Sequence, residues 1–175
     1  MDGRIYMIKV GIVGVGRVGS SLAFAMLFHP KVSDIYLSDT NKIALGGEVE
    51  DLKQAAVILS KRKKIHQSSC LRMRDCDYIF IAAGKARFSS DCSMKELFKE
   101  NYDLIRSITK RFTKENIYII TNPSDRLGKA LALKWLGKKL DDTRKKTNGK
   151  SGPWILDHKG YTNWGIASEA YKVIK

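Results

Sequence analysis

The residues best suited to chemistry stand near the start of this sequence, in the segment Gly14-Val15-Gly16-Arg17-Val18-Gly19. A β-rich apolar run precedes this segment and an apolar helical stretch follows it, so we expect a strand, a glycine turn and a helix. In such a turn Gly14 permits the tight bend, Gly16 lets the backbone approach a pyrophosphate, and Gly19 lets the helix pack on the strand. The N–H groups at the helix start would then bind phosphate.

A single carboxylate complements this turn. Asp39 follows the next short strand, twenty residues after Gly19, and so completes a dinucleotide-binding fingerprint. The Asp39 carboxylate would accept hydrogen bonds from the adenosine ribose hydroxyls, and its charge would repel a 2′-phosphate. We therefore predict NAD rather than NADP as the cofactor, with Arg17 and Val18 among the residues that bind it.

The cysteines add no further chemistry. Cys70, Cys76 and Cys92 show neither a CxxC spacing nor an even count. A disulfide framework or a zinc site is therefore not expected, and we predict reduced, non-catalytic thiols and no metal site.

The elements that must position these residues alternate between strand and helix. Strands are predicted over 5–13, 35–38, 78–84 and 117–120, with a minor strand near Ile65. Helices are predicted from residue 20, over about 45–59 and over 93–112, the last opened by a Ser93/Glu96 capping box with Leu97, Leu104, Ile105 and Ile108 inward. This alternation predicts an α/β fold, a doubly wound parallel sheet of the Rossmann type, over residues 1–125.

The remaining residues, 126–175, differ in composition. Between 126 and 150, nine basic residues stand against two acidic ones. We predict a helix over 124–136, an exposed basic linker over 138–153 and a last helix over 164–174. The chain is thus expected to carry a dinucleotide-binding domain and a short helical C-terminal segment.

Composition restricts the remaining function classes. The 175 residues are 43% hydrophobic and 29% charged, as in globular proteins, with a formal net charge of +14. No apolar run approaches the ~20 residues of a membrane span, and no signal-peptide pattern is present, so we expect a cytoplasmic protein. The basic segment raises nucleic acid as a partner, but its aromatic content is limited to Trp135 and it holds no recognition motif, which argues against this partner.

Several stretches together resemble the lactate/malate dehydrogenase family, in particular its prokaryotic malate dehydrogenase branch. They are KVGIVGVGRVGSSLAFAML, GEVEDLKQAA, IFIAAGKAR, a helix that reaches Asn101, and IITNPSD, in family order. The resemblance implies an NAD-dependent oxidoreductase of 2-hydroxy and 2-oxo acids that forms homo-oligomers. It also implies cofactor contacts from Ala83 and Gly84 on the adenosine side, and from Asn101, Ile120, Thr121 and Asn122 on the nicotinamide side.

The resemblance implies substrate contacts as well. Arg87 falls where malate-type enzymes carry an arginine that pairs with the distal carboxylate of the substrate, a contact suited to a bidentate guanidinium. Asn122 would also touch the substrate. Leu140-Asp141-Asp142-Thr143-Arg144 matches the family's LDxxR element, which makes Arg144 a third substrate-binding candidate.

Two departures from the family concern catalysis. The loop position that carries a carbonyl-polarising arginine in the family holds Met94 here, and a thioether supplies no positive charge. The segment from Trp154 to His158 matches the catalytic-histidine motif only with a gap. A longer, ungapped match places residues 155–167 on the family's late KGxTxxGxA segment, which makes His158 an ordinary turn residue.

Two functions therefore remain open. In the first, the chain is an NAD-dependent malate/lactate-type oxidoreductase with a reduced site of Arg87, Asn122, Arg144 and His158. In the second, it is a non-catalytic NAD-binding module that senses or sequesters the dinucleotide or regulates a partner. In both, residues 126–175 are a reduced remnant of the family's substrate domain.

Overall fold

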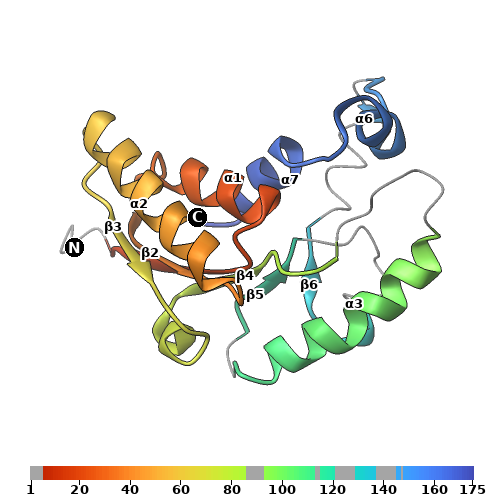
Figure 1. The fold of residues 1–175 in the computed structure, drawn as a ribbon, viewed down its shortest axis with the longest axis horizontal. Helices are drawn as coiled ribbons and strands as arrows, with labels where there is room; N and C mark the ends of the chain where they lie inside the picture. The colour runs from red at the N-terminus through yellow and green to blue at the C-terminus, as the bar shows by residue number, and fades with distance from the viewer. Residues whose placement is uncertain (1–5, 86–92, 113–114, 121–128, 137–144, 147) are drawn as a thin grey trace.

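The fold is a single six-stranded parallel sheet with helices on both faces (Figure 1). The computed structural model describes residues 6–85, 93–112, 115–120, 129–136, 145–146 and 148–175. The strand order is β3-β2-β1-β4-β5-β6, and every neighbouring pair is parallel. The elements are β1 (Ile8–Val13), α1 (Arg17–Met26), β2 (Val32–Ser38), α2 (Lys42–Ile58), β3 (Lys64–Gln67), the 3₁₀ turn η1 (Arg72–Asp75), β4 (Tyr78–Ile81), α3 (Met94–Thr109), β5 (Ile117–Ile119), β6 (Lys134–Trp135), α6 (Gly152–Lys159) and α7 (Trp164–Tyr171). This arrangement confirms the predicted doubly wound sheet.

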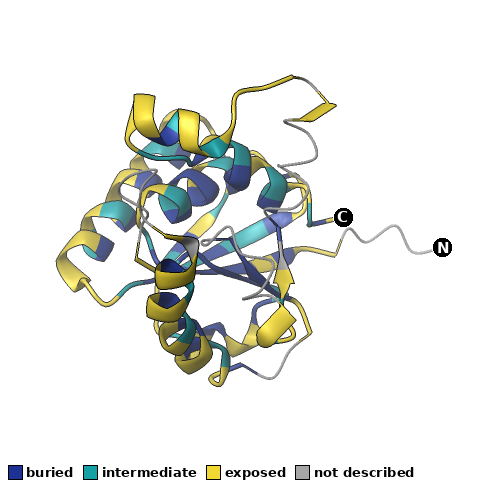
Figure 2. Ribbon diagram, turned by 90° about the vertical axis from the view of Figure 1, so that its right-hand side faces the viewer, coloured by how far each residue is buried: buried dark blue, intermediate teal, exposed yellow. Residues whose placement is uncertain are grey.

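The apolar strand runs are buried because both faces of the sheet are covered. Helices α1, α2 and α7 lie on one face, and α3 and η1 lie on the other (Figure 1). Successive side chains of a strand point to opposite faces, so Ile12 packs under α1 while Val13 packs toward η1 and α3. Figure 2 shows the same pattern, with buried strands between helices that are exposed on their outer sides.

Several predicted boundaries shift. Helix α2 begins at Lys42, not near residue 45, because the side chain of Asn41 accepts a hydrogen bond from the Ala44 N–H at 3.1 Å and caps it. The Ser93 cap of α3 is confirmed, with the Glu96 N–H 3.2 Å from the Ser93 oxygen. The prediction for Leu104 was wrong, since this side chain is 39% exposed on the outer side of α3.

The predicted helix over 124–136 agrees with the helical residues 129–130 but was wrong at 134–135. Lys134 and Trp135 form β6, which pairs in parallel with Tyr118 and Ile119 of β5. The open edge of β5 offers unpaired backbone groups to a further strand, and this tertiary pairing outweighs local helix propensity. The sheet therefore continues past residue 125.

The predicted last helix is confirmed as α7, although it ends at Tyr171 rather than Ile174. Helix α7 packs beside α1 (Figure 1), and its buried residues Ile166, Ala167 and Ala170 join the core beneath α1 and α2. Helix α6 was not predicted. It begins at Gly152, inside the stretch predicted as linker, and Ser151 caps it, because the Ser151 oxygen accepts from the Trp154 N–H at 3.3 Å.

A buried histidine joins the end of α1 to the C-terminal segment. His29 is 4% exposed; its Nε2 lies 3.3 Å from the Ile174 carbonyl oxygen, and its Nδ1 accepts from the Lys31 N–H. Burial lowers the pKa of His29, the charges of Lys63 and Lys31 lower it further, and the hydrogen bond to Ile174 opposes them. The neutral imidazole is therefore the form that fits the folded state.

None of the helices in the described part of the chain combines the length and the apolar character that a membrane crossing requires.

Candidate dinucleotide-binding site

The predicted cofactor residues gather where β1, β2 and β4 end. Strand β1 lies at the centre of the sheet, with β2 on one side and β4 on the other. After β1 the chain forms β2 and β3 on one side of β1, and then crosses to the other side to form β4. The loops that follow β1 and β4 therefore lead in opposite directions. Such a switch point at the carboxyl ends of parallel strands is where doubly wound sheets bind ligands.

The three glycines of the turn each have a separate structural reason. Gly14 has a φ of +96°, and a Cβ there would lie 2.5 Å from the Ala83 nitrogen at the end of β4. A Cβ on Gly19 would collide with the carbonyl oxygen of Gly14. At Gly16 a Cβ would meet nothing within 4 Å, so this backbone faces open space. The turn therefore requires Gly14 and Gly19 for its own packing, whereas Gly16 leaves room for a ligand.

The start of α1 is suited to an anion. Gly16 is the N-cap residue and provides no side-chain cap, and the first turn of α1 contains no acidic residue. The uncapped N–H groups and the helix dipole both favour negative charge at this point. Arg17, exposed in the first turn, adds a full positive charge, while the half-buried Val18 packs against the core.

Asp39 lies beside the turn, as predicted. One of its carboxylate oxygens accepts from the Val15 N–H at 2.8 Å, and the other accepts from the Asn41 N–H at 2.9 Å. The Thr40 hydroxyl also donates to the second oxygen, at 3.4 Å. A carboxylate has about four acceptor positions, so the oxygen that faces Val15 can still accept a hydroxyl hydrogen bond. The same side chain thus fixes the glycine turn and remains able to bind a ribose.

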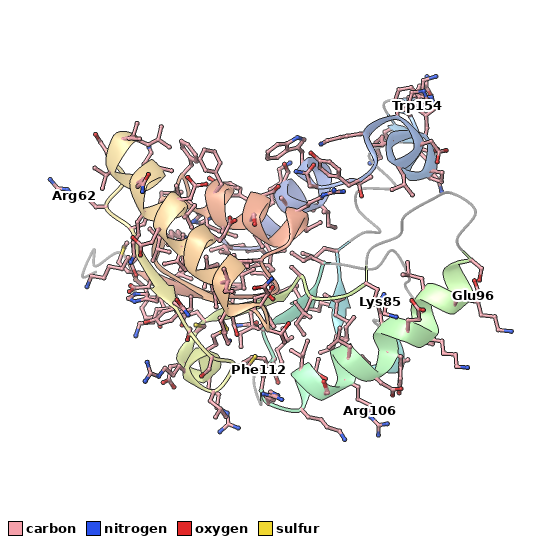
Figure 3. All side chains as sticks on the ribbon, viewed as in Figure 1. Arg62, Lys85, Glu96, Arg106, Phe112 and Trp154 are labelled. Carbon is pink, nitrogen blue, oxygen red and sulfur yellow. The ribbon has the colours of Figure 1, made fainter. Side chains whose placement is uncertain are left out.

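The end of β4 is held by an amide that comes from α3. Asn101 is 1% exposed; its Oδ1 accepts from the Lys85 N–H at 2.6 Å and its Nδ2 donates to the Lys85 carbonyl at 3.2 Å. The ammonium group of Lys85, which Figure 3 labels, lies 3.4 Å from the carboxylate of Glu100 on α3. Sequence reasoning gave Asn101 a cofactor contact; in this structure its amide holds the backbone after Ala83 and Gly84.

The structure describes some of the remaining predicted cofactor and substrate residues. Ile120 is buried, and its N–H donates to the Ile81 carbonyl at 3.0 Å, which brings the end of β5 beside the end of β4. Met94 opens α3, in agreement with its predicted place between the loop and the helix. The predicted residues Arg87, Thr121, Asn122 and Arg144 lie outside the described residues.

His158 does not lie in a turn. It occupies the last turn of α6, where it is exposed; its Nδ1 lies 2.8 Å from the Trp154 carbonyl oxygen and its ring stacks on the Trp154 ring, with centroids 3.8 Å apart. Figure 3 labels Trp154 at the outer end of this helix. Both contacts described for this imidazole are thus with Trp154, and neither is with a carboxylate. The interpretation of His158 as a turn residue was wrong, and its catalytic role stays a prediction.

One neighbour of the turn was missed entirely. The connector between α6 and α7 reaches the start of α1: the Arg17 guanidinium lies 4.2 Å from the Tyr161 ring centroid, and the buried Asn163 donates to the Ser21 oxygen at 2.7 Å. These contacts join residues more than 140 positions apart, so no local pattern could have indicated them.

The residues present fit a dinucleotide. The space at Gly16, the uncapped start of α1 and the available oxygen of Asp39 all lie at the carboxyl ends of β1 and β2. A chain without such a ligand has no packing reason for glycine at position 16, since a side chain would have room there.

Comparison with known proteins agrees with this assignment. The profile of the family described as lactate/malate dehydrogenase, NAD binding domain, matches residues 8–146. A probable L-lactate dehydrogenase of Schizosaccharomyces pombe is 35% identical over 123 residues, which are 67% of this chain and 36% of the relative. A malate dehydrogenase of Caldivirga maquilingensis is 33% identical over 153 residues, or 85% of this chain and 47% of the relative. In sequence, the chain thus spans less than half of the length of these relatives.

Solved structures show the same fold. The malate dehydrogenase of Archaeoglobus fulgidus, in complex with NADH, superposes with a TM-score of 0.78 at 25% identity, covering 96% of this chain and 76% of that one. The malate dehydrogenase of Plasmodium falciparum gives a TM-score of 0.81 at 18% identity, covering 97% and 77%. With a family profile that matches most of its length, this chain belongs to the lactate/malate dehydrogenase family and carries that family's NAD-binding domain.

Proposed function

We propose that this protein binds NAD(H) and that its function is that of a dinucleotide-binding module. The observation that carries the proposal is the open space at Gly16 between two glycines that the turn itself requires. The pyrophosphate would lie against Gly16 and the first N–H groups of α1, and the adenosine ribose would hydrogen-bond to Asp39. The nicotinamide, when bound, supplies a carbon that accepts or donates a hydride.

The arrangement supports binding more than turnover. Reduction of a 2-oxo acid needs a proton donor near the carbonyl and a cation that stabilises the developing alkoxide. His158 is exposed and stacked on Trp154, and Met94 stands where the resemblance places the arginine. Hydride transfer with a 2-oxo acid held by Arg87, Asn122 and Arg144 is the second candidate, favoured by the family positions that these residues occupy.

Residues 126–175 are proposed to be a shortened substrate domain. In the sequence alignment with the Archaeoglobus fulgidus enzyme, 122 aligned residues make up 41% of that enzyme. At this ratio, the 175 residues of the present chain are too few to fill the 76% of the enzyme that the structural match covers. A structural match that spans 76% of that enzyme must therefore pass over internal residues of the relative. This supports an internal deletion, with α7 retained because it completes the core beside α1.

A second copy of this chain is the proposed partner. Ile43, Val57 and Ile58 on α2 are 90%, 79% and 81% exposed, an unusual exposure for β-branched apolar side chains on one helix. The family resemblance also implies pairing of subunits through helices of the cofactor domain. We therefore propose a homodimer in which α2 contributes to the interface.

Calorimetric titration of the full chain with NADH and with NADPH tests the binding proposal. Saturable NADH binding with much weaker NADPH binding is expected, and absence of NADH binding would refute it. An assay that follows NADH absorbance after addition of oxaloacetate or pyruvate distinguishes the binding module from the oxidoreductase. No turnover supports the module, whereas turnover that is abolished in His158→Ala establishes the oxidoreductase.

A further inference from the structure

We infer that Tyr161 and Asn163, in the connector between α6 and α7, are positioning residues of the dinucleotide site and control its affinity for the pyrophosphate. This inference rests on the proposed NAD(H) binding and goes beyond it. It assigns a role in cofactor binding to a segment that follows the glycine turn by more than 140 residues.

A directed chain of hydrogen bonds links the connector to the first turn of α1. Lys159 donates to Asn163 Oδ1 at 2.6 Å, Asn163 Nδ2 donates to Ser21 Oγ at 2.7 Å, and Ser21 Oγ donates to the Arg17 carbonyl at 2.7 Å. Only the amide oxygen can face an ammonium group, so the orientation of Asn163 is fixed and the donors all point the same way. Each bond of such a chain polarises the next.

The chain is sheltered from water. Asn163 is 5% exposed and Ser21 is 8% exposed. A buried amide that has both ends bonded locates its neighbours firmly, because each alternative position would leave a polar atom unsatisfied. The Arg17 carbonyl, and with it the turn of α1 that follows Gly16, is therefore held by a residue of the C-terminal segment.

The same connector gathers two positive charges at the turn. The Arg17 guanidinium and the Lys159 ammonium lie 4.2 and 4.5 Å from the centroid of the Tyr161 ring. The sharp bend that brings the ring there occurs at Gly160, where φ is +78°, and the Gly160 carbonyl faces Arg17 Nη1 at 3.5 Å. An aromatic ring attracts cations, so Tyr161 holds each of these two positive charges against itself.

These two charges are available to an anion. Within the described part of the chain, the ion pairs are Lys53 with Glu50, His66 with Asp34 and Lys85 with Glu100, and none involves Arg17 or Lys159. Two cations on one ring, with Arg17 in the first turn of an uncapped helix, favour the approach of a negative group. The diphosphate of the dinucleotide is the group that the proposed function brings to this place, so Tyr161 and Asn163 prepare the site for its charge.

The test compares ligands with and without phosphate in the full chain. Wild type, Tyr161→Leu and Asn163→Ala are titrated with NADH, ADP and adenosine, by calorimetry for the first two and ligand-observed NMR for the last. Ser168→Ala on α7 is the matched control, because among the described residues its hydroxyl bonds to the Trp164 carbonyl of its own helix. We expect both connector variants to weaken NADH and ADP at least fivefold, with adenosine within twofold of wild type and the control unchanged.

Unchanged NADH affinity in both variants would overturn the inference, and so would an equal loss for adenosine, which indicates general loosening of the fold. If Asn163→Ala fails to fold, Tyr161→Leu decides alone, because its side chain lies in the connector and is only partly buried. A wild type that binds no NADH refutes the proposed function itself. A wild type that binds NADH while both variants bind equally well refutes the inference alone.

Discussion

Substitution of Gly16 by valine separates the binding role of the glycine turn from its role in folding. Gly16 has a φ of −72° and a ψ of −172°, which any residue adopts, and a Cβ there would meet nothing within 4 Å. The valine side chain therefore enters open space without displacing protein atoms. Fewer backbone states in the unfolded chain stabilise such a variant by ~0.4–1 kcal/mol, and the poorer N-cap residue offsets a similar amount. The melting temperature should stay within about 3 °C of wild type.

The effect on binding should be much larger. The isopropyl group fills the space through which a pyrophosphate reaches the first N–H groups of α1. Loss of one charge-assisted hydrogen bond costs about 1.5–3 kcal/mol, which corresponds to a roughly 10- to 100-fold weaker Kd for NADH. Calorimetric titration with NADH measures this loss, and thermal unfolding followed by circular dichroism measures stability.

Two other glycines provide the controls. Gly47→Ala also places a Cβ in open space, but on α2, where it should raise stability by up to ~1 kcal/mol and leave the NADH Kd unchanged. Gly19→Ala drives a Cβ into the Gly14 carbonyl and should unfold the turn. A Gly16→Val protein with a wild-type Kd would refute the assignment of this space to the pyrophosphate. A fall in melting temperature comparable to that of Gly19→Ala would show that Gly16 is needed for packing instead.

Three further outcomes are expected. Asp39→Ala should weaken NADH at least tenfold and narrow the preference over NADPH; an unchanged preference in parallel titrations would contradict the ribose contact. The pKa of His29 is lowered in the folded state, so the unfolded chain binds more protons than the folded chain below about pH 6.5. The free energy of unfolding should therefore decrease as the pH falls below this value, by at most ~1.4 kcal/mol per pH unit. Denaturant unfolding at pH 5 to 8 should show this slope in wild type and not in His29→Gln, and equal slopes would exclude His29 as its source. Val57→Lys combined with Ile58→Lys should convert a dimer into a monomer in light scattering, whereas Leu104→Lys on α3 should not.

The sequence was most informative where local and global demands agree. The apolar runs around Ile12 and Phe80 are buried on both faces, so they predict central parallel strands without knowledge of their neighbours. The glycine turn and Asp39 could be predicted because backbone conformation and ligand chemistry restrict the residue types at those positions. These features predict a candidate site at the ends of β1 and β2, where the structure brings the glycine turn and Asp39 together.

Features that depend on distant partners could not be predicted in this way. Strand β6 contains only Lys134 and Trp135 and exists because β5 offers an open edge, so its own sequence favours a helix as readily. The amide of Asn101 serves the backbone of Lys85, which lies 16 residues earlier. The approach of Tyr161 to Arg17 depends on the packing of α7, and no periodicity within either segment indicates it.

The packing of α7 beside α1 also has a consequence for synthesis. The face of α1 that carries Leu22 and Met26 shares its core with Ile166 and Ala170, which the ribosome adds some 140 residues later. At ~5–20 residues per second, that apolar face stays without its final partner for on the order of ten seconds. The newly made protein is therefore expected to depend on chaperones during this interval, and the last helix, rather than the first, determines when the nascent chain becomes safe from aggregation.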